Sequence, residues 1–353
     1  MKRIFIIILV VLFYQQANCQ VLLTADGSGS TYELITSVLA PGYNPIEVPD
    51  CSHNAFGRHI DEIFDADLNK NVFRFFMHVT PDDDRCINSD RQRNEIKSYD
   101  QSPDNLLGIE NEIVEYKWKF KLDANFQGSS SFTHLHQLKS VGGSLASMPM
   151  YTLTARKANP DRLELRYAET NSQITLLQED LAQFKGVWLD VVETITYGTI
   201  GTYSITISRV SDNVVLMNYS INNIINWRVG ADFVRPKWGI YRSLNNPSDL
   251  RDEEVLFADF SIEELSSLNT NDYNLYKNKI VISPNPAKDN IQFKEIDLER
   301  FDTIYIYNSL GKEIALKKVA NISLDISNLA KGIYFITFKK REKIVSINKL
   351  LVK

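Results

Sequence analysis

Short segments in which polar and apolar residues alternate are the feature that most constrains the fold of this chain. Examples are Glu115–Leu122 (EYKWKFKL), Leu163–Tyr167 (LELRY) and Ser204–Val210 (SITISRV). Successive side chains of a β-strand point to opposite faces, so each segment predicts a strand with one buried face. Turn signals such as Asn159-Pro160-Asp161 separate the segments.

Helical spacing is confined mainly to two segments, Ser30–Leu39 and Thr175–Phe184. Many strands and few helices over about 240 residues fit one large sandwich. We therefore predict an all-β fold, a jelly-roll (concanavalin-like) β-sandwich, and expect it to be a monomer.

The first 19 residues have the order of a removable signal peptide. Two basic residues precede the apolar run Ile4–Phe13, and polar and small residues follow it. The run is shorter than the about 20 residues that span a bilayer, so no membrane span is expected. A lipid on Cys19 is the alternative, but Gln16 and Asn18 are poor residues for the lipidation motif.

The rest of the chain divides at a polar segment. We expect a working domain over residues 20–264, a linker over 265–278 and a second β domain over 279–353. The last contains, in order, S-P-N-P-A from Ser283, Y-N-S-L-G-K from Tyr307 and D-I-S-N-L-A-K-G-I-Y-F from Asp325. These motifs resemble the type A sorting domain of the type IX secretion system, a small β-sandwich. The resemblance implies that this machinery exports the protein to the cell surface or the extracellular space.

Charge limits the partners of the working domain. The whole chain carries a formal net charge of −5, although the part from Lys277 onward is basic. The working domain is therefore acidic, which argues against nucleic acid, because phosphate binding needs a basic face. An anionic substrate would have to meet a local cluster of Arg and Lys.

Two cysteines remain once the signal peptide is removed, Cys51 and Cys86. Exported proteins keep disulfides, so we predict one bond between them; two buried free thiols are the alternative.

Three strand-like segments have polar residues at every second position, which places those side chains on one face. On the first, these residues are Arg91, Arg93, Glu95 and Lys97. On the second, Gln137 and Lys139 share a face, with His134 and His136 on the opposite one. On the third, Lys237, Gly239 and Tyr241 share a face, with Trp238 and Arg242 behind. A face rich in Arg, Gln, Lys and Tyr suits an acidic sugar chain.

The same segments resemble, in order, the R-x-E-x-R, Q-I-H and Y-x-K-x-G-x-Y motifs of jelly-roll alginate lyases. Here they read R-N-E-I-K from Arg93, Q-L-K from Gln137 and K-W-G-I-Y from Lys237. Lys139 stands where that family has its catalytic histidine, and Arg235 where it has a tyrosine. The stretch from Val21 to Glu264 looks most like the short ulvan lyases, which cut a sulfated rhamnose–uronic acid polymer.

This resemblance implies β-elimination without a required cofactor. Gln137 and Arg93 would neutralise the uronate carboxylate, Lys139 would remove the C5 proton and Tyr241 would protonate the leaving oxygen. Lysine is a base only if its pKa falls well below about 10.4, so His134 and His136 are alternatives as the base. Other expected substrate contacts are His134, His136, Glu95, Lys97, Lys237 and Arg242.

The sequence also fits other functions. They are a lyase for alginate or glucuronan, a non-catalytic carbohydrate-binding sandwich, and a glycoside hydrolase with Glu95 and Glu193 as its two carboxylates. His53, His59 and Asp61 have no recognisable metal-binding spacing, so no metal site is predicted. The acidic run Asp82-Asp83-Asp84 could hold a structural Ca²⁺.

Overall fold

The computed structural model describes residues 20–265, 280–294, 301, 303–309, 311–318, 323–340 and 343–353. The predicted signal peptide and most of the predicted linker lie outside these residues. The chain divides into two compact units, Met1–Ser266 and Ser267–Lys353. Both are built almost wholly of antiparallel β-strands, so the predicted all-β class is confirmed.

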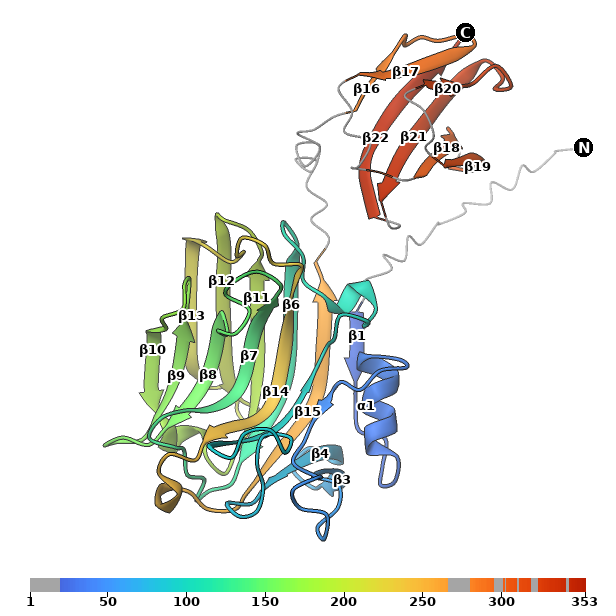
Figure 1. The fold of residues 1–353 in the computed structure, drawn as a ribbon. Coiled ribbons are helices and arrows are strands. Elements are labelled where there is room, and N and C mark those ends of the chain that lie inside the picture. The colour runs from blue at the N-terminus through green and yellow to red at the C-terminus, as the bar shows by residue number, and fades with distance from the viewer. Residues whose placement is uncertain are drawn as a thin grey trace, which may run out of the picture. The chain divides into compact units, whose positions relative to one another are not determined.

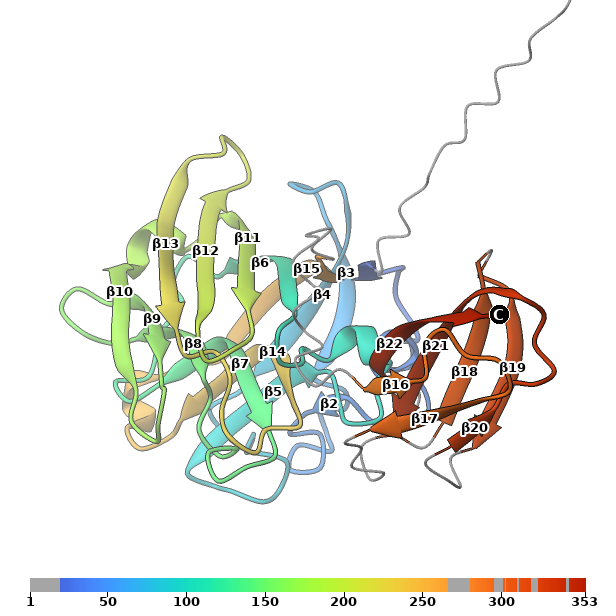
Figure 2. The same cartoon turned by 90° about the horizontal axis from the view of Figure 1, so that it is seen from above.

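The first unit consists of two sheets stacked face to face, as Figures 1 and 2 show. Sheet A has the order β13 (Val215–Ile224), β12 (Gly201–Arg209), β11 (Trp188–Thr196), β6 (Ile113–Leu122), β15 (Glu253–Glu264), β4 (Lys70–Met77) and β3 (Ile60–Asp65). A further strand, β1 (Gln20–Leu23), also pairs with β15. Sheet B has the order β10 (Ile174–Asp180), β9 (Arg162–Tyr167), β8 (Tyr151–Arg156), β7 (Thr133–Val141), β14 (Phe233–Ser243), β5 (Arg91–Lys97) and β2 (Ile46–Glu47). This is the jelly-roll sandwich that the alternation predicts.

The core of this unit lies between the sheets, where the alternating apolar residues meet. Strand β6 shows the pattern: Tyr116, Trp118 and Phe120 are buried, and the intervening lysines lie on the other face. Trp118 meets Trp238 of sheet B at 6.1 Å between ring centroids. Burying one such side chain contributes about 1.5–3 kcal/mol, so the alternation also fixes which face of each strand turns inward.

One of the two predicted helices is confirmed and the other is wrong. Helix α1 (Thr31–Leu39) forms and buries Ile35 and Leu39. The segment Thr175–Phe184 instead contributes β10, which pairs with β9, followed by the short 3₁₀ turn η2 (Leu181–Phe184). Strand pairing outweighs a weak helical preference here, because β10 gains a backbone ladder at the sheet edge. The other 3₁₀ turns are η1 (Asp104–Leu106) and η3 (Pro247–Asp249).

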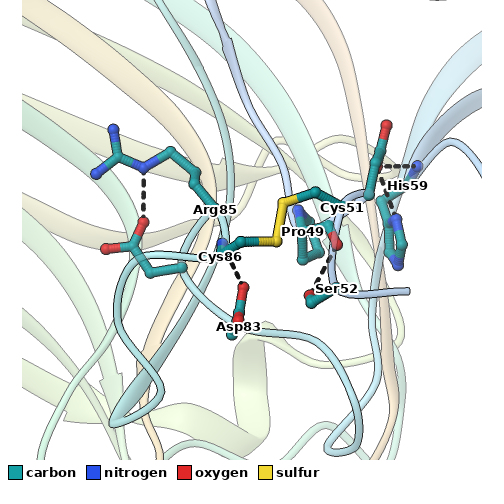
Figure 3. The surroundings of a disulfide bond; sticks show 9 residues. Pro49, Cys51, Ser52, His59, Asp83, Arg85 and Cys86 are labelled. Atoms are coloured by element: carbon teal, nitrogen blue, oxygen red, sulfur yellow. Dashed lines mark hydrogen bonds and ion pairs between the residues drawn. A yellow bond between two sulfur atoms is a disulfide. The ribbon is translucent and has the colours of Figure 1, made fainter. Parts of the chain in front are cut away.

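Cys51 and Cys86 form a disulfide with 6.2 Å between their Cα atoms, which confirms the prediction. The bond joins the loop before β3 to the loop between β4 and β5 (Figure 3). The backbone N–H of Cys86 donates to the Asp83 carboxylate, which holds the second loop beside the bond.

The second unit has two smaller sheets and its own core. One has the order β16 (Val281–Ser283), β17 (Asn290–Lys294) and β20 (Ser323–Asp325). The other has the order β19 (Glu313–Lys318), β18 (Thr303–Asn308), β21 (Gly332–Lys340) and β22 (Lys343–Val352). Ile291, Ile336 and Phe338 are buried between them. Among the described residues of the whole chain, no helix has the length and apolarity needed to cross a membrane.

Candidate functional site

The candidate site lies on the face of sheet B that points away from sheet A. We call this the outer face. Its central residues, on strands β5, β7 and β14, are Arg93, Glu95, Lys97, Gln137, Lys139, Lys237 and Tyr241. The alternate residues point toward sheet A; Asn94, for example, donates to the backbone carbonyls of His59 and Phe76. The polar positions at i, i+2 thus bring together side chains that are far apart in the sequence.

Two buried glutamates organise this face. Glu95 accepts from Arg93 Nη1 at 2.6 Å and contacts Lys237 Nζ at 2.6 Å, and Gln137 Nε2 also donates to it. Burial alone would raise the pKa of Glu95, but Lys237 and Arg93 hold it below its usual value. Glu95 is therefore an ionised anchor for these three side chains.

Glu47, on the two-residue strand β2, is the second anchor, and the sequence analysis did not single it out. It accepts from Lys97 Nζ at 2.8 Å and Lys237 Nζ at 2.5 Å. Arg93 is held further by Asp84, whose carboxylate lies 2.8 Å from Arg93 Nε. Neither acid lies on a strand long enough to show alternation, so only their acidity could have drawn attention to them.

A β-bulge in β7 changes which histidine reaches the outer face. The pairing of β7 shifts between His134 and His136 against β8, and the pairing with β14 shifts between Trp238 and Tyr241. His134 therefore joins Gln137 and Lys139 on the outer face, and the prediction that both histidines lie opposite those residues is wrong for His134.

His136 points into the core, and its prediction as a substrate contact is wrong. Its side chain is 1% exposed, bonds Glu193 at 2.8 Å through Nε2 and packs on Trp118. The prediction of Arg242 as a substrate contact is wrong for the same reason. It is fully buried, and it donates to Gln92 Oε1 at 2.7 Å and to the carbonyl of Arg251.

His134 is on the outer face but is poorly suited to act as a base. Burial lowers its pKa to about 3, so the imidazole is neutral across the physiological range. Its Nδ1 lies 2.7 Å from Thr154 Oγ1, and its ring packs against Phe132 and Tyr241. A nitrogen with this pKa holds a proton too weakly for efficient general base catalysis near neutral pH.

Lys139 is half-buried and forms no hydrogen bond or ion pair with any residue that the structure describes. Burial, and after it the charges of Lys237 and Arg93, lower its pKa to about 8. A substantial fraction of this amine is therefore neutral in mildly alkaline solution, as a base requires.

Arg235 is the cross-strand partner of Lys139, and it too lacks a carboxylate partner within the described part of the chain. Its Nε is buried without a partner, and its one hydrogen bond is a long one, 3.5 Å, to the Ser98 carbonyl. Two adjacent cations without counter-charges, in an otherwise well-paired network, form a place for an anion.

Tyr241 lies at the other end of the polar group. The Arg93 guanidinium sits 3.7 Å from its ring centroid, and Arg91 Nη1 donates to its hydroxyl at 3.1 Å. Arg93 thus contacts Tyr241 directly and also lowers the pKa of Lys139. Tyr241 is partly exposed and has a cationic donor beside its hydroxyl, so the hydroxyl can meet a bound substrate.

The carboxylate pair of the hydrolase alternative is absent from the outer face. Glu193 is on β11 of sheet A, is fully buried and bonds His136 and Tyr203. It cannot flank a cleft with Glu95, so the prediction of these two residues as a catalytic carboxylate pair is wrong. The three carboxylates of the acidic run Asp82-Asp83-Asp84 accept from three different residues. Asp82 accepts from the backbone N–H of His78, Asp83 from that of Cys86, and Asp84 from the Arg93 side chain.

Comparison with known proteins gives different results for the two units. Residues 281–353 match the family model of the secretion system C-terminal sorting domain. This match confirms the predicted sorting domain and, with it, the predicted export to the cell surface or the extracellular space. No curated protein matches the chain.

Among solved structures, the first unit is similar to lyases of low sequence identity. An alginate lyase of Aplysia kurodai is 14% identical with a TM-score of 0.47, covering 68% of this chain and 97% of that one. A glucuronan lyase of Trichoderma reesei is 15% identical with a TM-score of 0.41, covering 58% and 86%. At these values the likeness carries no argument about activity, which has to come from the site itself.

Proposed function

We propose that the first unit is a polysaccharide lyase that cleaves a uronic-acid polymer by β-elimination, with ulvan as its substrate. The observation that carries the proposal is Lys139. It is an amine without an ion-pair partner in the described structure, with a pKa lowered to about 8, on the same sheet face as Gln137 and Tyr241. The chemistry that fits such an amine is proton abstraction next to a carboxylate, because a neutral lysine is a base of suitable strength.

In the proposed reaction, Lys139 takes the proton from C5 of the uronate. The electron pair forms the C4–C5 double bond, the C4–O bond breaks, and Tyr241 protonates the departing oxygen. The carboxylate carries the charge that develops at C5, and hydrogen-bond donors fixed in advance stabilise it. Gln137 is held for this role by Glu95, and Arg93 by Glu95 and Asp84.

The choice of an anionic polymer rests on the cations of this face. Arg235 lies opposite Lys139 on the neighbouring strand and has no carboxylate partner among the described residues, and Arg91, which pairs with Asp90, is half-exposed at the Tyr241 end. Together they offer charge to a polymer with carboxylate and sulfate groups along its length. Ulvan has both groups, whereas alginate and glucuronan have carboxylates alone, so a sulfated polymer uses more of this surface.

The test is ultraviolet absorbance of the unsaturated product when the purified full chain is incubated with ulvan, alginate and glucuronan. We expect product from ulvan, and we expect Lys139→Arg and Tyr241→Phe each to lower the rate by about 10²–10⁴-fold. Lys139→Arg keeps the charge but removes the titratable amine. Lys157→Arg, at a half-exposed lysine that pairs with Asp249, is the matched control.

Two results would contradict the proposal. Full activity of folded Lys139→Arg would exclude Lys139 as the base. Binding of the polymers without any product would leave a carbohydrate-binding sandwich as the function.

A further inference from the structure

We infer that His53, His59, His78 and Asp82 form a binding site for one divalent transition metal ion, with zinc the best match. One ligand atom from each residue lies within 4.8 Å of the others. The ligands flank the β3–β4 hairpin: His53 and His59 lie in the loop that ends at β3, and His78 and Asp82 lie in the loop that follows β4. This inference does not depend on the proposed lyase activity.

The three histidine side chains converge on the Asp82 carboxylate. Asp82 Oδ1 lies 2.9 Å from His53 Nδ1 and 3.1 Å from His59 Nε2, and Asp82 Oδ2 lies 3.1 Å from His78 Nδ1. In a tetrahedral zinc site with bonds of about 2.0–2.1 Å, ligand atoms are roughly 3.3 Å apart. Only small side-chain movements would therefore place an ion among them.

The surroundings have the features of a metal site. His59 is fully buried, and its second nitrogen, Nδ1, lies 2.8 Å from Asp50, as in the carboxylate–histidine–metal arrangement. Asp50 is itself held by the Tyr32 hydroxyl. The Phe56 ring packs against all three imidazoles at 4.4–5.3 Å and gives the cluster an apolar cover.

The ligand types select the ion. Ca²⁺ and Mg²⁺ prefer oxygen ligands, so three imidazole nitrogens argue against both. Three nitrogens and one carboxylate oxygen fill a tetrahedron, the usual geometry of structural zinc. The side chains of His53 and His78 are 20% and 19% exposed, so an ion can enter from solvent.

The site joins the same two loops as the Cys51–Cys86 disulfide. The second of these loops also contains Asp84, which holds Arg93 on the outer face. A bound ion would therefore fix the loop from which Asp84 positions Arg93, which is a structural role.

The experiment measures metal content rather than activity. The full chain is stripped with a chelator, dialysed against zinc and assayed by plasma mass spectrometry, and Co²⁺ loading reports the geometry by visible absorption. We expect about one ion per chain and a tetrahedral Co²⁺ spectrum. His53→Gln and His78→Gln should lose the ion, and Asp50→Asn should bind it about 10–100-fold more weakly.

Asp61→Asn is the matched control, because Asp61 is close in sequence but pairs with Arg74. It should bind like the unaltered chain. The chain has five histidines, and the other two, His134 and His136, are buried elsewhere, so alternative histidine sites are few. Near-ultraviolet circular dichroism shows whether each variant is folded.

A stripped, folded chain that takes up no zinc would overturn the inference, and so would folded His53→Gln and His78→Gln variants that bind as much zinc as the unaltered chain. The four residues would then be a hydrogen-bonded cluster around Asp82. If both variants unfold, the test uses the unaltered chain alone. Zinc must then raise the melting temperature of the stripped protein, and the absence of such a rise would overturn the inference.

Discussion

The chemistry of the outer face depends on which charged residues are paired and which are not. Glu95 and Glu47 form ion pairs with Arg93, Lys97 and Lys237, so these cations are held in fixed positions. Lys139 and Arg235 form no ion pair with any carboxylate among the described residues. A low lysine pKa needs neighbouring cations that stay charged, and the paired residues supply them.

A first prediction concerns the pH dependence of the proposed activity. The lowered pKa of Lys139 means that its neutral, active form accumulates as the pH rises through about 8, so kcat/KM should rise over that range. Arg235 is one of the cations that lower this pKa. Arg235→Gln should therefore raise it and move the acidic limb of the profile to higher pH.

At neutral pH this shift should lower kcat/KM by about 3–10-fold, and the loss should disappear in alkaline solution. The measurement is a profile of kcat/KM against pH. Arg162→Gln, at an arginine of β9 that bonds Gln178, is the control and should leave the limb in place. A loss that is equal at all pH values would show that Arg235 acts by binding alone.

At the scale of single elements, sequence alternation could predict β5 and β14 well but not β7. The residues of β5 alternate without interruption, so Arg93, Glu95 and Lys97 share the face that their spacing predicts. In β7 the bulge separates His134 from His136, and alternation alone cannot show an inserted residue.

One local signal of that irregularity is Gly239. Its φ is +144°, and a Cβ there would lie 2.1 Å from the Asn94 carbonyl oxygen, so only glycine fits. A glycine inside a strand indicates a bulge or a close backbone approach, but it does not tell which neighbouring strand shifts.

The loops at the ends of β3 and β4 were the least predictable elements. The histidines at 53, 59 and 78 and the acid at 82 are brought together by the β3–β4 hairpin, and their spacing matches no common metal motif. Glu47 was missed for a related reason, since a two-residue strand shows no period.

A second prediction concerns the disulfide that ties these loops. The two cysteines are 35 residues apart in the sequence, and closing a loop of that length in the unfolded chain is worth about 4 kcal/mol. A Cys51→Ser, Cys86→Ser double variant should lose roughly 2–4 kcal/mol of the free energy of unfolding of the first unit. The measurement is the urea unfolding transition of that unit.

The control is the unaltered protein measured with and without a reducing agent, which should reproduce most of the difference. A change well below about 1 kcal/mol would mean that the loops are held by other contacts, such as those around Asp82 and Asp84.

At the scale of the whole molecule, sequence could predict the sorting domain because it depends on short motifs in a fixed order. Those motifs occupy turns and strand ends, such as S-P-N-P-A from Ser283, and residues 281–353 match the sorting-domain family. The proposed activity of the first unit depends instead on contacts between distant strands, which no short motif records.

The last prediction follows from the separate cores of the two units. The core of the first includes Trp118, Trp238 and Phe257, and that of the second includes Ile291, Ile336 and Phe338. Because each unit buries its own apolar residues, deleting residues 267–353 should leave the melting temperature of the first unit within about 2 °C of its value in the full chain. Calorimetry of the full chain should show two transitions, only one of which persists after the deletion, and the rate of the proposed lyase reaction should be unchanged. A single transition in the full chain, or a large drop in the melting temperature of the shortened protein, would show that the first unit needs the sorting domain for its stability.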